Sequence, residues 1–183
     1  MKSIILLIIS IITLQANAQY RGLEWGSTKK NAIEKYGNPD VDGDSYIAYN
    51  YTLAGKSTLS VFYYKQDKLW MGVYLLEETH SNKNTYIDDY NSFKDLLSKK
   101  YGTPTEDETY WIDDLYKDDY SGWGMAISKG DMLKYSTWSD DKTDIECSIL
   151  GDNYDITCKI RYASIELKDW VEKIDEKENL DDF

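Results

Sequence analysis

A five-residue motif, K-Y-G-x-P, occurs twice in the chain and constrains the fold more than any other feature. It occupies residues 35–39 and 100–104 and contains both prolines of the chain. A glycine after the last apolar residue of a helix, with a proline two residues later, is a typical helix end. We therefore expect two helices, one ending before Gly37 and the other before Gly102.

Apolar residues at helical spacing precede each motif. In the first segment Ser27 is the expected N-cap, and Ala32, Ile33 and Tyr36 fall on one face. The second segment has an apolar stripe at steps of three and four, formed by Tyr86, Tyr90, Phe93, Leu97 and Tyr101.

The similarity between the two halves continues downstream. Residues 64–69 align with residues 128–133 at an offset of 64, and both segments read as hairpin turns between strands. We expect a duplicated α+β unit, with residues 19–80 as the first repeat and 81–178 as the second. Its helices should pack on one face of antiparallel sheet.

The second repeat is longer than the first. Residues 143–150 and 155–162 alternate as a further hairpin, and an acidic tail at 179–183 ends the chain. Between them lies an expected amphipathic helix that carries Leu167, Trp170, Val171 and Ile174.

Residues 1–18 have the features of a secretory signal peptide. A basic start precedes an apolar run over 4–14, which is too short to cross a membrane, and Ala16-Asn17-Ala18 fits a cleavage site. We expect cleavage between Ala18 and Gln19, no membrane span after cleavage, and a periplasmic or extracellular protein.

The charge narrows the range of partners. The chain has 33 acids and 21 bases, for a formal net charge of −12. Nucleic acids and anionic membrane surfaces are bound through excess lysine and arginine, so neither is an expected partner.

Each predicted repeat consists of a helix, a G-x-P stop and a hairpin, and the first has a glycine-rich entry at residues 22–27. This pattern resembles the repeat of secreted β-lactamase-inhibitory proteins. The same pattern is similar to that of small outer-membrane-assembly lipoproteins, although this chain lacks the lipoprotein cysteine. The resemblance implies a helix layer on a curved antiparallel sheet whose open face binds another protein.

No catalytic signature is present, and we expect neither an enzyme nor a cofactor. His80 is the only histidine and lies in a polar stretch, which predicts a solvated loop residue. An acidic pair of the glycosidase kind remains an alternative, because Asp113-Asp114 and Asp118-Asp119 surround a hairpin region. We interpret these four as solvated loop charges.

A weak calcium motif follows the first helix stop. Asn38, Asp40, Asp42 and Asp44 stand at positions 1, 3, 5 and 7 of an EF-hand-like loop. Position 12 is Tyr49 rather than a glutamate, so a polar loop is the preferred interpretation and no metal is expected.

The two cysteines are predicted to form a disulfide. With Asp152-Asn153 as the centre of a tight turn, Cys147 lies directly opposite Cys158. An exported chain with only these two cysteines favours the bond.

The expected function is protein binding through an aromatic sheet face. A regular register around the turn at 66–67 places Tyr63, Trp70 and Tyr74 on the face opposite the helices. The offset of 64, together with strand parity, adds Lys134, Trp138 and Trp123 from the second repeat.

Such a face, with acids around it, suits a basic protein partner, and a glycan is a second candidate. The alternatives are an extracellular hydrolase that uses an acidic pair, and an envelope scaffold or assembly protein.

Overall fold

The computed structural model describes residues 19–181 of the 183-residue chain. The predicted signal peptide therefore lies outside the described residues, as do the last two residues of the predicted tail. The elements of the first half are β1 (Gln19–Tyr20), β2 (Leu23–Glu24), α1 (Lys29–Tyr36), β3 (Val41–Asp42), β4 (Tyr46–Leu53), β5 (Lys56–Lys65) and β6 (Lys68–Leu76). The elements of the second half are α2 (Thr85–Tyr101), β7 (Glu106–Trp111), the short 3-10 helix η1 (Tyr120–Gly122), α3 (Trp123–Lys129), β8 (Met132–Ser139), β9 (Thr143–Asp152), β10 (Asp155–Ser164) and α4 (Ile165–Asp181).

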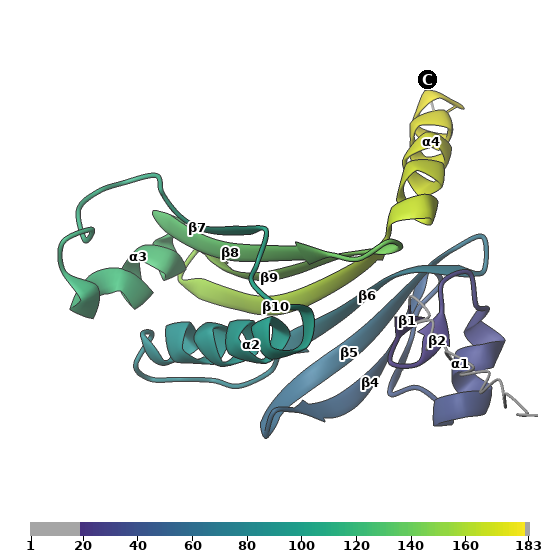
Figure 1. Ribbon diagram of the computed structural model, residues 1–183, viewed down its shortest axis with the longest axis horizontal. Coiled ribbons are helices and arrows are strands. Elements are labelled where there is room, and N and C mark those ends of the chain that lie inside the picture. The colour runs from purple at the N-terminus through teal and green to yellow at the C-terminus, as the bar shows by residue number, and fades with distance from the viewer. Residues whose placement is uncertain (1–18, 182–183) are drawn as a thin grey trace, which may run out of the picture.

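Eight of the strands form one continuous antiparallel sheet in the order β3-β4-β5-β6-β10-β9-β8-β7 (Figure 1). Each half contributes four strands in chain order, and the halves meet where β6 pairs with β10. That seam joins Tyr74 to Ile160 and Gly72 to Tyr162. The α+β class and the antiparallel sheet are thus confirmed, and both halves share a single sheet.

Both predicted helix stops are present. Gly37 and Gly102 have φ of 84° and 87°, and their N–H groups donate to Ile33 and Ser98 carbonyls at 2.9 Å. Glycine reaches positive φ at little cost, which explains why both helices end at this residue. The predicted N-cap is wrong by one position: Thr28, not Ser27, caps α1.

Helix α2 contributes most of the helical part of the core. It buries a stripe against β8, β9 and β10 that matches the predicted one closely and consists of Ile87, Tyr90, Phe93 and Leu97. Helix α3 lies beside it on the same strands. Helix α4 stands on the side of the sheet away from α2 (Figure 1).

The segment that follows the predicted cleavage site inserts into the core. Tyr20 is fully buried, and its hydroxyl lies 2.9 Å from Ser60 Oγ and donates to the Val73 carbonyl at 2.9 Å. Arg21 next to it lies over the rings of Tyr36 and Tyr51, at 4.6 and 4.1 Å from their centroids.

The correspondence predicted downstream of the repeated motif is wrong. Residues 66–67 do form the β5–β6 turn, but residues 128–133 cover the end of α3 and the start of β8. An insertion between β7 and β8, which includes α3, occupies the place where a hairpin was expected.

The final helix is confirmed and is longer than predicted. Helix α4 continues to Asp181 and so includes residues that were expected as a tail. Within residues 19–181, no helix is long and apolar enough to cross a membrane.

Candidate functional site

A β-bulge at Trp70 changes which residues of β6 face the helices. The predicted register holds for Tyr64 with Leu69, but the next pair is Tyr63 with Met71, so Trp70 has no partner in β5. One extra residue moves every later side chain of the strand to the opposite face. Residues 71–76 therefore point the other way from the prediction.

The predicted aromatic face is consequently wrong. Tyr74 is 8% exposed and packs in the main core, with its ring 5.1 Å from that of Tyr20. Trp70 itself is half-buried at the bulge, and of the three first-repeat residues Tyr63 alone stays on the face opposite α2. That face is mainly aliphatic in this half and carries Ala48, Leu59, Val61, Tyr63, Met71, Val73 and Leu75.

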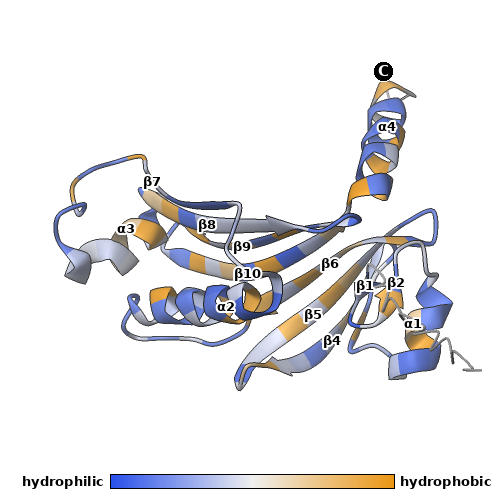
Figure 2. Ribbon diagram, viewed as in Figure 1, coloured by the Kyte–Doolittle hydropathy of each residue, from blue (hydrophilic) through white to orange (hydrophobic). Residues whose placement is uncertain are grey.

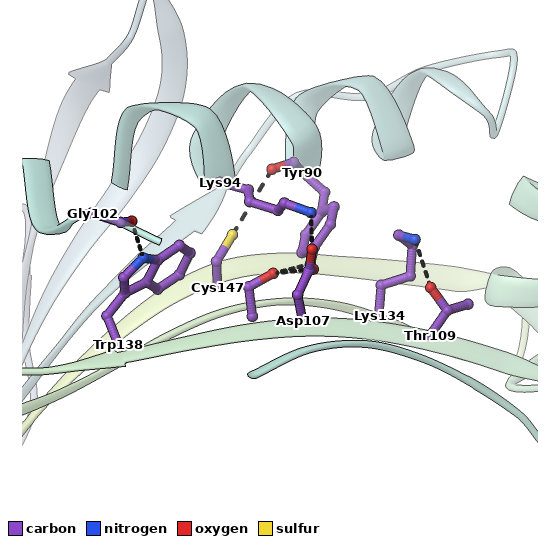
Figure 3. A network of polar contacts seen from close by, with 9 residues as sticks. Tyr90, Lys94, Gly102, Asp107, Thr109, Lys134, Trp138 and Cys147 are labelled. Carbon is purple, nitrogen blue, oxygen red and sulfur yellow. Dashed lines mark hydrogen bonds and ion pairs between the residues drawn. The ribbon is translucent and has the colours of Figure 1, made fainter. Parts of the chain in front are cut away.

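Two predicted residues of the second repeat lie under α2 instead of on the open face (Figure 3). Trp138 is 3% exposed, and its indole N–H donates to the Gly102 carbonyl at 3.0 Å. The indole therefore satisfies the carbonyl at the helix stop, which is a structural role.

Lys134 lies on the same side of the sheet, between two rings. Its ammonium donates to Thr109 Oγ1 at 2.7 Å and lies 5.6 Å from the ring centroid of Trp123 and 5.9 Å from that of Tyr90. Burial lowers the pKa of Lys134, and the nearby Lys94 ammonium lowers it further. The side chain is therefore held within the fold, and it does not extend from an open face.

A chain of hydrogen bonds next to Lys134 ties α2 to the edge of the sheet. Tyr90 and Ser136 hydroxyls lie 2.7 Å apart, and Ser136 donates to Asp107 Oδ1 at 2.8 Å. Lys94 reaches the other carboxylate oxygen at 2.5 Å (Figure 3). Burial acts to raise the pKa of Asp107, but the hydrogen bonds from Lys94 and Ser136 outweigh it and lower that pKa.

The predicted disulfide is not formed. The β9–β10 turn is centred on Asn153-Tyr154 rather than Asp152-Asn153, so Cys147 pairs with Ile160 and Cys158 with Ile149. Diagonal positions of this kind lie roughly 7–8 Å apart, beyond disulfide reach. Both thiols are buried and free.

Two carboxylates of the candidate calcium loop are engaged in other interactions. Asp40 accepts the Asn50 N–H at 2.7 Å, and Asp42 pairs with Lys29 at 2.7 Å. Over residues 19–181, no three His, Cys, Asp or Glu side chains are grouped to hold a metal. Asn38 and Asp44 remain polar loop residues beside these two.

His80 is not the freely solvated loop residue that was predicted, because it joins an ion cluster around the buried carboxylate of Asp89. Its Nε2 lies 2.6 Å from Oδ2 of Asp89, a carboxylate on α2 that is 2% exposed, and Lys56 pairs with the other oxygen. The cluster joins the start of β5 to α2. Asp89 interrupts the apolar stripe between Tyr86 and Tyr90, and a carboxylate at such a position was the available signal.

The most exposed apolar side chains within the sheet and its connections lie between β7 and α3. Ile112 is 68% exposed and Leu115 is 70% exposed, and Tyr110 and Tyr120 are also largely exposed. Residues 110–125 carry four acids and one lysine. Figure 2 shows the hydrophobic and hydrophilic positions alternating along this connection. We call residues 110–125 the acidic loop.

The base of the acidic loop is fixed by several contacts. Trp123, the last of the predicted binding residues, has its ring centroid 5.6 Å from Trp111 and 5.1 Å from Tyr120. Asn84 holds the loop backbone through two hydrogen bonds: its amide donates to the Tyr120 carbonyl at 2.9 Å and its Oδ1 accepts the Gly124 N–H at 2.6 Å. A connection held in this way presents its tip in a defined conformation.

No protein family, curated protein or solved structure matches this chain. The resemblance to β-lactamase-inhibitory proteins and outer-membrane-assembly lipoproteins stays a prediction.

Proposed function

We propose that the protein is an exported, non-catalytic binding protein that contacts another protein through the acidic loop. The observation that carries the proposal is the exposure of Ile112 and Leu115, whose aliphatic side chains are more than two-thirds open to solvent. Apolar side chains held out on an ordered connection are typical of a protein interface.

The order of the loop supports the same function. Trp123 and Asn84 hold the loop before any partner arrives, so little conformational entropy is lost on binding. The first half of the sheet has no equivalent: its link from β3 to β4 spans only residues 43–45, whereas β7 and β8 are separated by residues 112–131.

The charge of the loop indicates the kind of partner. Asp113, Asp114 and Asp118 are exposed beside the apolar side chains, and Lys117 is the one basic residue among them. A partner with an apolar recess surrounded by lysine or arginine fits this pattern, and opposite charges would accelerate the encounter.

The test compares two leucines that are equally exposed. Leu115→Ser changes the acidic loop, and Leu180→Ser changes a leucine that is 74% exposed near the end of α4. Partners captured from the native envelope and culture medium are quantified by mass spectrometry, and the affinity of the purified partner is then measured at two salt concentrations. We expect Leu115→Ser to weaken binding by about tenfold or more and Leu180→Ser to leave it unchanged.

Two outcomes would contradict the proposal. One is that Leu115→Ser keeps every partner at full affinity. The other is turnover of a polysaccharide or peptide by the purified protein that is lost in an Asp→Asn variant, which would favour the hydrolase alternative.

A further inference from the structure

A hollow of about 470 Å³ lies at the base of α4. It forms where four segments distant in sequence meet: the end of β2, the start of β6, the β8–β9 turn and the first turn of α4. Its volume falls within the range of small-molecule sites in proteins. No motif in the sequence pointed to it, because its walls come from such distant segments.

One wall of the hollow is an aromatic ring with a fixed orientation. The indole N–H of Trp25 donates to Thr143 Oγ1 at 3.0 Å. The backbone next to Trp25 is also anchored, since the Gly26 N–H donates to the Leu69 carbonyl at 2.8 Å. Ile165 and Leu167 add aliphatic surface to the same hollow.

The rim of the hollow carries charged groups of both signs, and three of them are not engaged within the described residues. Asp141, Lys142 and Glu166 line it, and within residues 19–181 their side chains make no hydrogen bond or ion pair. Lys68 also lines it and lies 4.7 Å from the ring centroid of Trp170. The hollow therefore offers acceptors and donors around an apolar wall.

These features favour a polar ligand with many hydrogen-bonding groups. Three acids (Glu24, Asp141 and Glu166) and two lysines (Lys68 and Lys142) line the hollow, and an apolar ligand would desolvate them without compensation. A ring with a C–H face and a hydroxyl rim fits this lining. Its C–H face can lie on Trp25, and its hydroxyl groups can donate to the carboxylates and accept from the ammonium groups.

We propose that the hollow at the base of α4 binds a saccharide residue. The site shares no residue with the acidic loop, so either proposal can fail without the other.

The test follows the indole N–H signals of the purified protein by ¹H–¹⁵N NMR, with the Trp25 signal assigned from a Trp25→Phe variant. The probes are glucose, N-acetylglucosamine and the β-1,4-linked disaccharide of each. We expect at least one probe to shift the Trp25 signal saturably, with a dissociation constant below about 10 mM.

Two pairs of substitutions distinguish specific binding in the hollow from a general effect of removing surface charges. Asp141→Asn with Lys142→Gln removes rim charges at an exposed turn, and Asp95→Asn with Lys99→Gln makes the same changes on the exposed side of α2. We expect the first pair to weaken binding by about tenfold or more and the second to leave it unchanged. The proposal is overturned if no probe moves the Trp25 signal, or if the first pair binds as well as the original protein.

Discussion

Gly72 of β6 lies directly against the ring of Tyr20, so that an added Cβ on Gly72 would overlap the ring atoms. The position is available only because Gly72 has no side chain. The sheet thereby holds Tyr20, the second residue after the predicted cleavage site.

This contact predicts a strong coupling between the two residues. Gly72→Ala should lower the free energy of unfolding by about 2 kcal/mol, because the core has no room for the methyl group. In a Tyr20→Ala background the same change should cost less than about 0.5 kcal/mol, because the ring is gone. Urea unfolding of the four proteins measures the coupling, and an equal cost in both backgrounds would refute the contact.

The two cysteines should behave as buried free thiols. Burial raises the pKa of Cys158 to about 12 and that of Cys147 well above its ordinary value, so neither is a thiolate near neutral pH. Iodoacetamide should leave the mass of the folded protein unchanged and should alkylate both cysteines after unfolding without reductant. Alkylation that appears only after reduction would instead support the predicted disulfide.

The ion cluster around Asp89 should contribute strongly to stability. Asp89→Ala leaves Lys56 and His80 without their shared partner and should lower the free energy of unfolding by about 3 kcal/mol. Asp95→Ala, on the exposed side of the same helix, should change it by less than about 0.5 kcal/mol. Similar values for the two variants, measured by urea unfolding, would argue against a buried cluster.

Asp107 should make the protein sensitive to acid. Its pKa in the folded protein is lower than in the unfolded chain, so as the pH falls below about 4 the unfolded state takes up the proton first. The stabilisation is therefore present above that pH and is lost as the pH falls through the folded-state pKa.

The Asp107→Asn variant tests this directly. It should be less stable at pH 6 by no more than about 1 kcal/mol, because the carboxylate is 44% exposed and partly screened. The loss of stability between about pH 6 and pH 3 should be smaller than in the original protein. Asp118→Asn is the control for removing one negative charge, and an equal effect there would exclude a specific role for Asp107.

The helix ends were predictable from sequence because they depend on residues that are adjacent in the chain. Gly37 and Gly102 each stop a helix through their own backbone conformation, and an added Cβ on either would meet nothing within 4 Å. No tertiary contact is needed to explain them.

The predicted binding face failed because of one unpaired residue. Leu69, Trp70 and Met71 are all apolar, so the change of parity at Trp70 leaves no break in the hydrophobic pattern. The face of each side chain after that point depends on the bulge, which the pattern does not reveal.

The β9–β10 register failed for a different reason. The observed pairing differs from the predicted one by two residues, and such a shift keeps every side chain on the same face. Alternation therefore could not decide between the two turns. Asn153 and Tyr154 both adopt positive φ, which is unusual for a tyrosine.

The pairing of β6 with β10 has a consequence for how the chain is made. Residues 72–75 cannot pair with residues 159–162 until these have been synthesised. During synthesis the edge of β6 therefore stays unpaired until nearly the whole chain has emerged. Contacts so distant in sequence form slowly, and an open strand edge is a template for pairing with other chains. We therefore expect molecules truncated before β10 to aggregate. We also expect the synthesis of β10 to determine when the nascent protein is protected against pairing with other chains.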